Sequence, residues 1–580
     1  MRNPFVDYLN TLHNAAGANT NALAESQAVE PFYKHLQVHR RVGKHLARML
    51  QDEPRCIILT GHAGDGKTGL LHQILVDLGA LDSSAAIPRA SEATMPGRKM
   101  KLFFAKDMSE LSAAEQENLL IQALQAPQDG SSSILVSNTG PLLHTFKRLQ
   151  EKGKLPGSFQ EFQSDLLTAM DASEPNSVQL DGYEFVLVNM ARIDNVGMVG
   201  LLLQNLTAEA VWADCQACPA RDKCPVLNNA ITVRRNLERA TSFIETYLLW
   251  LQEHDSRLTL RQILAQLAYA MTSNLSCENI HSFLDTKHYL FRFHFANALW
   301  GFRGVEDNPA SSQLQAVSSL RRLQLDEKSV GADYNLFVRK DLSAFDDATR
   351  ELIDEFLRGK IVDGMSPVAD ARGRKSVRRF YYLFASQEPE AEFEQLLGSL
   401  FSPVLPSYLR LRYGRALQAD RRLVKRALLQ GLYRSIVGVP RLDGKDGIHV
   451  TLRHDRSGIT GVQLLLGEVR GDELELRSEP VEAFGDYPDN RPLHAIVLKL
   501  RNSAAVHEIR LPLLDYLYHL AEGVVSTRVN PYLSHGIDKI KASLMEYVGK
   551  SEDDVRLLVL TPDGPETLEL FIDGDRLIVS

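Results

Sequence analysis

Short apolar runs alternate with segments of helical periodicity over the first 200 residues of the chain. Ile57, Ile58 and Leu59 predict a buried strand, and the apolar spacing of residues 68–78 predicts a helix directly after it. Three more strands, separated by helical stretches, are predicted by the apolar runs within residues 101–111, 131–143 and 183–195. Strands that alternate with helices form a parallel sheet flanked by helices, and ligands bind beyond the carboxyl ends of such strands. The pattern therefore predicts an α/β fold with a ligand site on that rim.

The pattern changes further along the chain. Residues 234–253 and 258–273 have helical spacing, whereas residues 440–510 and 555–580 alternate apolar and polar positions, as antiparallel strands do. At 580 residues the chain is too long for one core. We expect an N-terminal helical segment (1–50), the α/β core (51–200), a helical lid (201–300), a helical and locally basic region (301–435), and a smaller β-rich α+β interaction domain (436–580).

The turn between the first strand and its helix carries the strongest motif of the chain. It fits G-x-x-x-x-G-K-[ST], and its strand–loop–helix setting is the one in which such a loop binds phosphate. Lys67 would reach the β- and γ-phosphates of ATP, and the Thr68 hydroxyl would hold Mg²⁺. The sequence thus predicts a P-loop NTPase core. The predicted nucleotide-binding residues are Gly61, His62, Ala63, Gly64, Asp65, Gly66, Lys67, Thr68 and Gly69.

The acidic partner of this loop is ambiguous in the sequence. No predicted strand ends in the pair of acids expected of a hydrolysing site. Asp107 and Glu110 are the nearest acidic candidates, and Asn138 follows the next strand. We predict Lys67, Asp107 and Asn138 as catalytic residues. The alternative is slow hydrolysis, or hydrolysis that needs groups from a partner.

Other polar residues fall near the same rim or in the predicted lid. Asn189 and Arg192 follow the strand within 183–195, although Asn in particular also suits turns. Four lid arginines could approach the γ-phosphate, and the alternative for each is a solvated surface position: Arg234, Arg235, Arg239 and Arg261.

Three of the five cysteines lie within ten residues of one another, at Cys215, Cys218 and Cys224. Cys-x-x-Cys spacing lets two thiolates face one metal, and a structural zinc site needs four ligands. We predict Cys277 as the fourth, with His281 beside it as an alternative. An iron–sulfur cluster and three free thiols remain open as alternatives to zinc. Cys56 lies in a predicted strand, as a core cysteine does.

Charge and composition limit the partners and the cellular location that the sequence predicts. The net charge of −8 argues against a wholly cationic nucleic-acid coat, but arginines cluster in residues 372–379 and 410–426. These stretches suit contact with a DNA backbone, and a solvated helix face or a subunit contact would use the same residues. Because no apolar run reaches about eighteen residues and no signal peptide is visible, we expect a cytoplasmic protein without a membrane span.

Several segments together resemble the DptF family, the ATPase component of DNA phosphorothioation-dependent restriction systems. The carrying segments are GHAGDGKT, FFAKDMSEL, LVSNTGPLL, VNMARIDN, the CxxCP…CP cluster with Asn228, RRFYYLF and LPLLDYLYHLAEG. The resemblance, or one to a related prokaryotic defence ATPase, implies a P-loop ATPase that acts with partner subunits against DNA lacking the host's sulfur modification. It transfers the phosphate-loop role to Gly61, Gly66, Lys67 and Thr68 and gives no catalytic acid.

Two functions from different classes follow. The first is an ATPase of a multi-protein DNA restriction or anti-phage system, in which nucleotide state is coupled to DNA or partner engagement. The second is a nucleotide-gated scaffold or switch with little turnover, a hypothesis favoured by the missing acidic pair. A homo-oligomer is compatible with either function.

Overall fold

The computed structural model describes residues 2–14, 32–83, 85–95, 100–172, 175–180, 182–283, 286–361, 370–441, 446–452, 461–481, 494–524, 529–549, 555–561, 564–573 and 576–579. The chain divides into two compact units. Unit 1 comprises Met1–Pro389 with Ala483–Asn490, and unit 2 comprises Glu390–Glu482 with Arg491–Ser580. The division of the chain into five parts stays a prediction.

Unit 1 contains a six-stranded sheet in the order β2-β3-β4-β1-β6-β5. The four inner strands run parallel: β3 (Lys101–Ala105), β4 (Ser132–Val136), β1 (Cys56–Thr60) and β6 (Tyr183–Asn189). Two antiparallel edge strands complete it: β2 (Ala90–Thr94) and β5 (Asn176–Leu180). The predicted α/β class is confirmed, but the sheet is mixed rather than wholly parallel.

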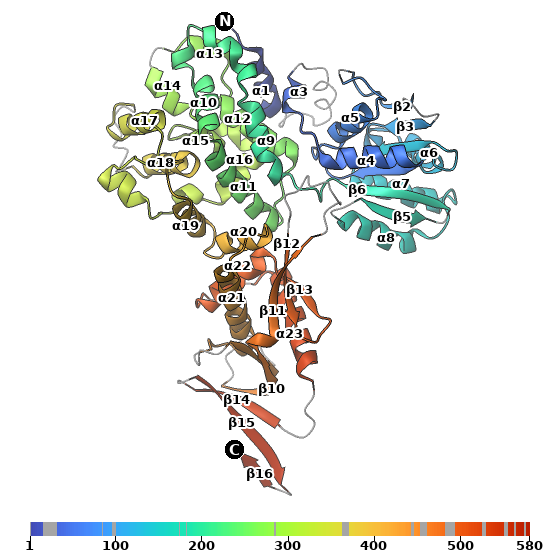
Figure 1. Cartoon of the computed structure of the whole chain (residues 1–580), viewed down its shortest axis with the longest axis vertical. Coiled ribbons are helices and arrows are strands. Elements are labelled where there is room, and N and C mark those ends of the chain that lie inside the picture. The colour runs from blue at the N-terminus through green and yellow to red at the C-terminus, as the bar shows by residue number, and fades with distance from the viewer. Residues whose placement is uncertain are drawn as a thin grey trace. The chain divides into compact units, whose positions relative to one another are not determined.

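Helices cover both faces of this sheet (Figure 1). One face packs on α4 (Arg41–Asp52) and α5 (Lys67–Asp77), and the other on α6 (Ala113–Gln125), α7 (Thr139–Glu151) and α8 (Phe159–Asp171). Successive residues of β1 point to opposite faces, so Ile57 and Leu59 join the first core while Ile58 joins the second. Burial on both faces explains why the inner strands are continuous apolar runs.

The rest of unit 1 is largely helical. Its helices are α1 (Pro4–Asn14), α3 (Tyr33–Leu36), α9 (Val199–Leu206), α10 (Pro225–Arg235), α11 (Leu237–Glu253), α12 (Leu260–Thr272), α13 (Cys277–His281), α14 (Thr286–Arg292), α15 (Phe295–Leu299), α16 (Gln315–Arg322), α17 (Asp347–Leu357) and α18 (Ala371–Phe384). A short hairpin pairs β7 (Phe302–Arg303) with β8 (Glu306–Asp307). One stretch of the described residues, Val196–Ala217, would be long and apolar enough to cross a membrane, and the half-buried helix α9 lies within it.

In the described residues of unit 2, five α-helices are combined with two antiparallel sheets. Its helices are α19 (Glu390–Leu400), α20 (Leu405–Arg412), α21 (Gln418–Val437), α22 (Leu511–Ala521) and α23 (Pro531–Val548). One sheet has the order β16-β15-β14-β10-β9 and the other β11-β12-β13. The strands are β9 (Gly447–Leu452), β10 (Val462–Arg470), β11 (Leu474–Pro480), β12 (His494–Leu500), β13 (Val506–Glu508), β14 (Val555–Thr561), β15 (Gly564–Asp573) and β16 (Arg576–Val579). The smaller β sheets that the sequence predicts near the C-terminus are therefore present.

Candidate functional site

The glycine-rich loop, residues 61–66, turns the chain from β1 into α5. Gly64 and Gly66 have φ angles of 91° and 86°, a left-handed conformation that favours glycine. A Cβ atom on Gly64 would lie 3.0 Å from Thr259 Oγ1 and 3.1 Å from the Arg261 Cβ, so the loop packs closely against the start of α12. The Arg261 N–H also donates to the Gly64 carbonyl at 3.1 Å. The loop is therefore tied to the helical part of unit 1.

A cavity opens between this loop, the segment around α3 and the first turns of α12. The cavity has a free volume of about 200 Å³, more than ten times the volume that one water molecule needs. The predicted residues on its wall are Ala63, Gly64, Gly66, Lys67, Thr68, Gly69, Asp107, Glu110, Asn138 and Arg261. Apolar side chains that the sequence analysis did not single out line it too: Leu12, Leu36, Val38, Leu260 and Leu264. In the sequence, these apolar residues cannot be told apart from residues of the hydrophobic core.

Lys67 is the first residue of α5, and its side chain folds back over the loop. Its Nζ donates to the carbonyls of His62 at 2.8 Å and Gly61 at 3.3 Å, and to Asn138 Oδ1 at 2.7 Å. Burial lowers the pKa of Lys67, an effect that the nearby carboxylates of Asp107 and Asp65 oppose. A buried ammonium that rests on carbonyl groups is ready to exchange them for a stronger anionic partner.

A short chain of hydrogen bonds joins the ends of β3 and β4 to this lysine. Asp107 caps a 3₁₀ turn, Met108–Glu110, by accepting from the Ser109 N–H at 2.8 Å. The Ser109 hydroxyl accepts from the Asn138 N–H at 2.7 Å, and Asn138 accepts from Lys67. Adjacent parallel strands thus bring Asp107, Asn138 and Lys67 to one rim, where the sequence analysis expects them.

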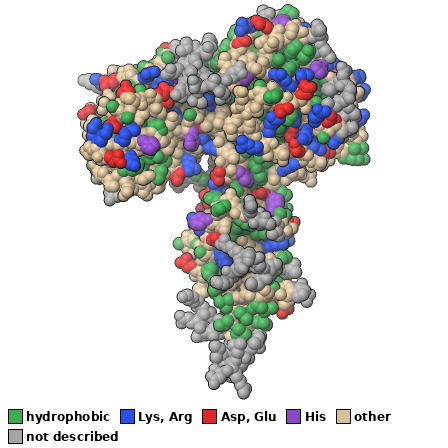
Figure 2. Space-filling model, turned by 180° about the vertical axis from the view of Figure 1, so that it is seen from behind, with side chains coloured by type: hydrophobic (Ala, Val, Ile, Leu, Met, Phe, Trp, Pro, Cys, Tyr) green, Lys and Arg blue, Asp and Glu red, His purple; other side chains and the backbone are tan. Residues whose placement is uncertain are grey.

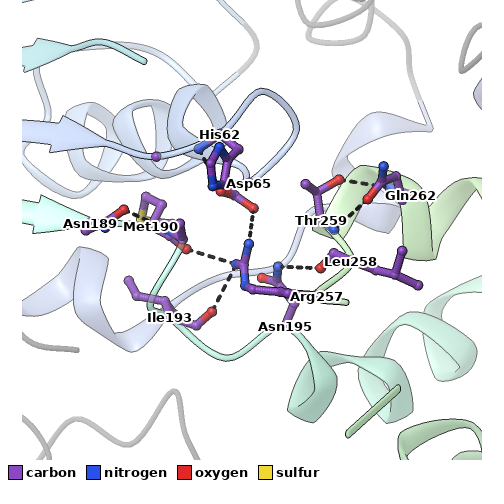
Figure 3. A network of polar contacts seen from close by, with 12 residues as sticks. His62, Asp65, Asn189, Met190, Ile193, Asn195, Arg257, Leu258, Thr259 and Gln262 are labelled. Atoms are coloured by element: carbon purple, nitrogen blue, oxygen red, sulfur yellow. Dashed lines mark hydrogen bonds and ion pairs between the residues drawn. The ribbon is translucent and has the colours of Figure 1, made fainter. Parts of the chain in front are cut away.

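Asp65 links the glycine loop to Arg257, which is distant in sequence (Figure 3). Its fully buried carboxylate accepts from the His62 N–H at 2.9 Å and from Arg257 Nη1 at 2.8 Å. Arg257 also donates to the carbonyls of Met190 at 3.1 Å and Ile193 at 3.3 Å, beyond the end of β6. Arg257 therefore ties the glycine loop and the sheet rim to the α11–α12 linker. Sequence reasoning missed it; the one available signal was an acidic residue inside a phosphate-binding motif.

The remaining rim and lid candidates have other partners. Asn189 shapes a turn, since its amide donates to the Met170 carbonyl at 2.6 Å and accepts from the Ala191 N–H at 3.0 Å. Arg192 pairs with Asp171, and Arg234 with Glu209. Arg239 is buried against Glu388 at 3.1 Å and donates to the Tyr382 carbonyl, and Arg235 is exposed. Of the four predicted lid arginines, all of which the structure describes, Arg261 alone lines the cavity.

Four of the five cysteines line a second, much smaller cavity. Its free volume is about 20 Å³, and its wall contains Cys215, Cys218, Cys224, Cys277 and His281. Cys218 Sγ lies 3.7 Å from His281 Nε2. Burial raises the pKa of Cys224 to about 12. Within the described ranges, no three His, Cys, Asp or Glu side chains stand ready to hold a metal ion, so the zinc and iron–sulfur hypotheses stay predictions.

Much of the predicted basic surface is neutralised. In residues 372–379, Arg378 and Arg379 are buried and donate to Asp333 at 2.6 Å and to Asp326 at 2.7 Å. In residues 410–426, Arg410 pairs with Asp420 at 2.5 Å. Arginines that stay exposed in the second stretch are Arg415, Arg421, Arg422 and Arg426. On the face shown in Figure 2, basic side chains lie among acidic ones.

Comparisons with protein-family models, with curated proteins and with solved structures find no match to this chain. The resemblance to DptF-type ATPases stays a prediction from the sequence.

Proposed function

We propose that this chain binds ATP with Mg²⁺ in the cavity at the glycine loop and hydrolyses it. One observation carries the proposal. A lysine and a threonine at the start of a helix, a carboxylate after β3 and an amide after β4 all face one cavity: Lys67, Thr68, Asp107 and Asn138. This is the set of groups that phosphoryl transfer requires.

The chemistry follows from these groups. Lys67 would exchange the loop carbonyls for the β- and γ-phosphates, and the N–H groups of the first turn of α5 would bind phosphate oxygens. Mg²⁺ prefers oxygen ligands, and the Thr68 hydroxyl with the Asp107 carboxylate would hold it and neutralise phosphate charge. Asp107 and Asn138 are the candidates to orient the attacking water. Arg261, on the same wall, would stabilise charge on the γ-phosphate.

The apolar half of the cavity suits the nucleoside. Leu36 and Val38 precede the glycine loop in sequence, and Leu260 and Leu264 belong to α12. A flat base buried between these side chains would leave the triphosphate at the loop. Closure of α12 over the base would then depend on nucleotide.

A nucleotide-gated switch with little turnover is the second candidate. At the cavity, the carboxylate of Asp107 follows β3 and the amide of Asn138 follows β4, whereas efficient hydrolysis usually uses two acids. The other carboxylate on the cavity wall is that of Glu110, one turn further along the chain. In this case the tie between the glycine loop and α12 would report nucleotide state without rapid turnover.

The cellular role rests on the sequence resemblance. We propose a cytoplasmic component of a multi-protein prokaryotic restriction or anti-phage system that acts with other subunits. Contact with a DNA backbone would fall to the exposed arginines of the second basic stretch, Arg415, Arg421, Arg422 and Arg426.

Phosphate release by the full-length chain, measured with MgATP and with or without DNA, tests the proposal. We expect turnover that Lys67→Ala abolishes and that Lys147→Ala, at a half-exposed position on α7, leaves unchanged. ATP binding with negligible release under both conditions would favour the switch. Equal release by the wild type and Lys67→Ala would refute the assignment of the site.

A further inference from the structure

The small cavity brings together four thiols from separate parts of the chain. Cys215, Cys218 and Cys224 lie in the connection between α9 and α10, whereas Cys277 begins α13. All four lie on its wall. The start of α1 closes the cavity, with Asn3 and Val6 on the same wall.

The size of this cavity limits what it can take. Free space of about 20 Å³ is enough for one water-sized particle or one metal ion. A cluster of several irons and sulfides is larger, so the space favours a single ion over an iron–sulfur cluster. Zn²⁺ is the single ion that four thiolates suit best in a structural site.

Hydrogen-bond donors already point at three of the four sulfurs. The Asn3 side-chain amide donates to Cys215 Sγ at 3.3 Å, and the Asn3 N–H donates to Cys277 Sγ at 3.5 Å. The Leu227 N–H donates to Cys224 Sγ at 3.4 Å, and His281 lies beside Cys218. Donors around the ligands orient them and stabilise the anionic thiolate that a metal requires.

We propose that Cys215, Cys218, Cys224 and Cys277 bind one structural Zn²⁺ ion. The sulfurs are not yet arranged around a common point, so binding draws them together by side-chain rotation. Each thiol gives its proton to solvent as its Zn–S bond forms, and no oxidant or reductant is needed. His281 remains outside the ligand set, next to Cys218.

Helix α1 reaches from the zinc site to the nucleotide cavity, and α12 connects the nucleotide cavity to the segment that carries Cys277. The start of α1 lies at the thiols, while Leu12, near its end, lines the nucleotide cavity. Helix α12 begins at the nucleotide cavity with Leu260 and Arg261, and the chain continues from its other end to Cys277.

Polar contacts join α1 to the end of α12. The Asn10 amide donates to the Leu275 carbonyl at 2.9 Å, and His13 Nε2 lies 3.4 Å from Thr272 Oγ1. Zinc would therefore hold in place two helices that form walls of the nucleotide cavity. This second step rests on the proposed function.

Metal content of the purified full-length chain tests the site. Elemental analysis should give about one zinc and no iron per chain. Each of Cys215→Ser, Cys218→Ser, Cys224→Ser and Cys277→Ser should lose it, while Cys56→Ala, at a buried cysteine of β1, and His281→Ala keep it. Stoichiometric iron, no bound metal, or zinc retained by the four serine variants would overturn the proposal.

A second measurement uses the wild-type protein, so its result does not depend on whether a variant folds. A thiol-reactive mercurial added to the native wild type should release the zinc to a colorimetric chelator. Release should be complete when four thiols have reacted. Release complete after one or two thiols would contradict a four-thiolate site.

Affinity for a non-hydrolysable ATP analogue tests the coupling. Removal of zinc should weaken binding about tenfold, and zinc added back should restore it. Identical affinity with and without zinc would refute the coupling. If zinc binds as expected but neither form binds the analogue, the proposed function fails and the metal site stands.

Discussion

The nucleotide cavity and the thiol cavity share α1 but differ in how the chain builds them. The first is organised around one contiguous motif, residues 61–69, at the rim of a buried sheet. The second needs segments up to 274 residues apart, since Asn3 and Cys277 must meet. A contiguous motif on a rigid sheet is held in place by the fold. Thiols on short turns need a metal or a neighbouring helix to hold them. The two sites should therefore respond differently to mutation.

The largest difference should appear in Lys67→Ala. This variant loses a charge-assisted contact with the phosphates, so affinity for MgATP should fall about 100-fold, which corresponds to about 2.7 kcal/mol. The zinc content should not change. Calorimetric titration and elemental analysis of the same sample check both expectations, and loss of zinc together with nucleotide would contradict the separation of the two sites.

Arg257→Ala should lower the stability of the fold around the glycine loop and leave the thiol cavity unaffected. It leaves the fully buried Asp65 carboxylate without its cation, at a cost of about 3 kcal/mol in unfolding free energy. Denaturant unfolding measures the loss. Adding Asp65→Asn to Arg257→Ala should recover part of it, because an amide costs less to bury than a charge. No difference between the single and double variants would count against the ion pair as the cause.

Asp107→Asn should separate hydrolysis from binding. We expect the turnover rate to fall by about 10²-fold or more, while nucleotide affinity stays within a few-fold. Glu110→Gln is the matched control on the same 3₁₀ turn and should have the smaller effect. Phosphate-release kinetics decide between them, and the reverse order of effects would move the catalytic role to Glu110.

The inner strands, the glycine loop and the α12 segment could be predicted from the sequence, because each has a strong local pattern. The edge strands β2 and β5 were missed, since they are short and largely polar. The Asp65–Arg257 pair could not be predicted, because its partners lie 192 residues apart. The acid-rich surroundings of Arg378 and Arg379 were equally hidden, so residues 372–379 suggested a more basic surface than the fold leaves.

The smallest expected effect concerns the link between the cavities. Asn10→Ala removes the hydrogen bond to the Leu275 carbonyl and should cost about 1 kcal/mol of unfolding free energy. It should also reduce the effect of zinc removal on nucleotide affinity. Thr11→Ala is the control, since that hydroxyl bonds to the Tyr8 carbonyl of its own helix. Equal coupling in both variants would show that this contact does not transmit it.

An experimental structure of the full-length chain with a non-hydrolysable ATP analogue and Mg²⁺ would test the proposed nucleotide site most directly. We predict that the triphosphate lies at the glycine loop. Lys67 Nζ should have left the carbonyls of Gly61 and His62 for phosphate oxygens, and Thr68 should contact Mg²⁺. An analogue bound elsewhere, or a Lys67 still held by those carbonyls beside a bound nucleotide, would contradict the proposed site.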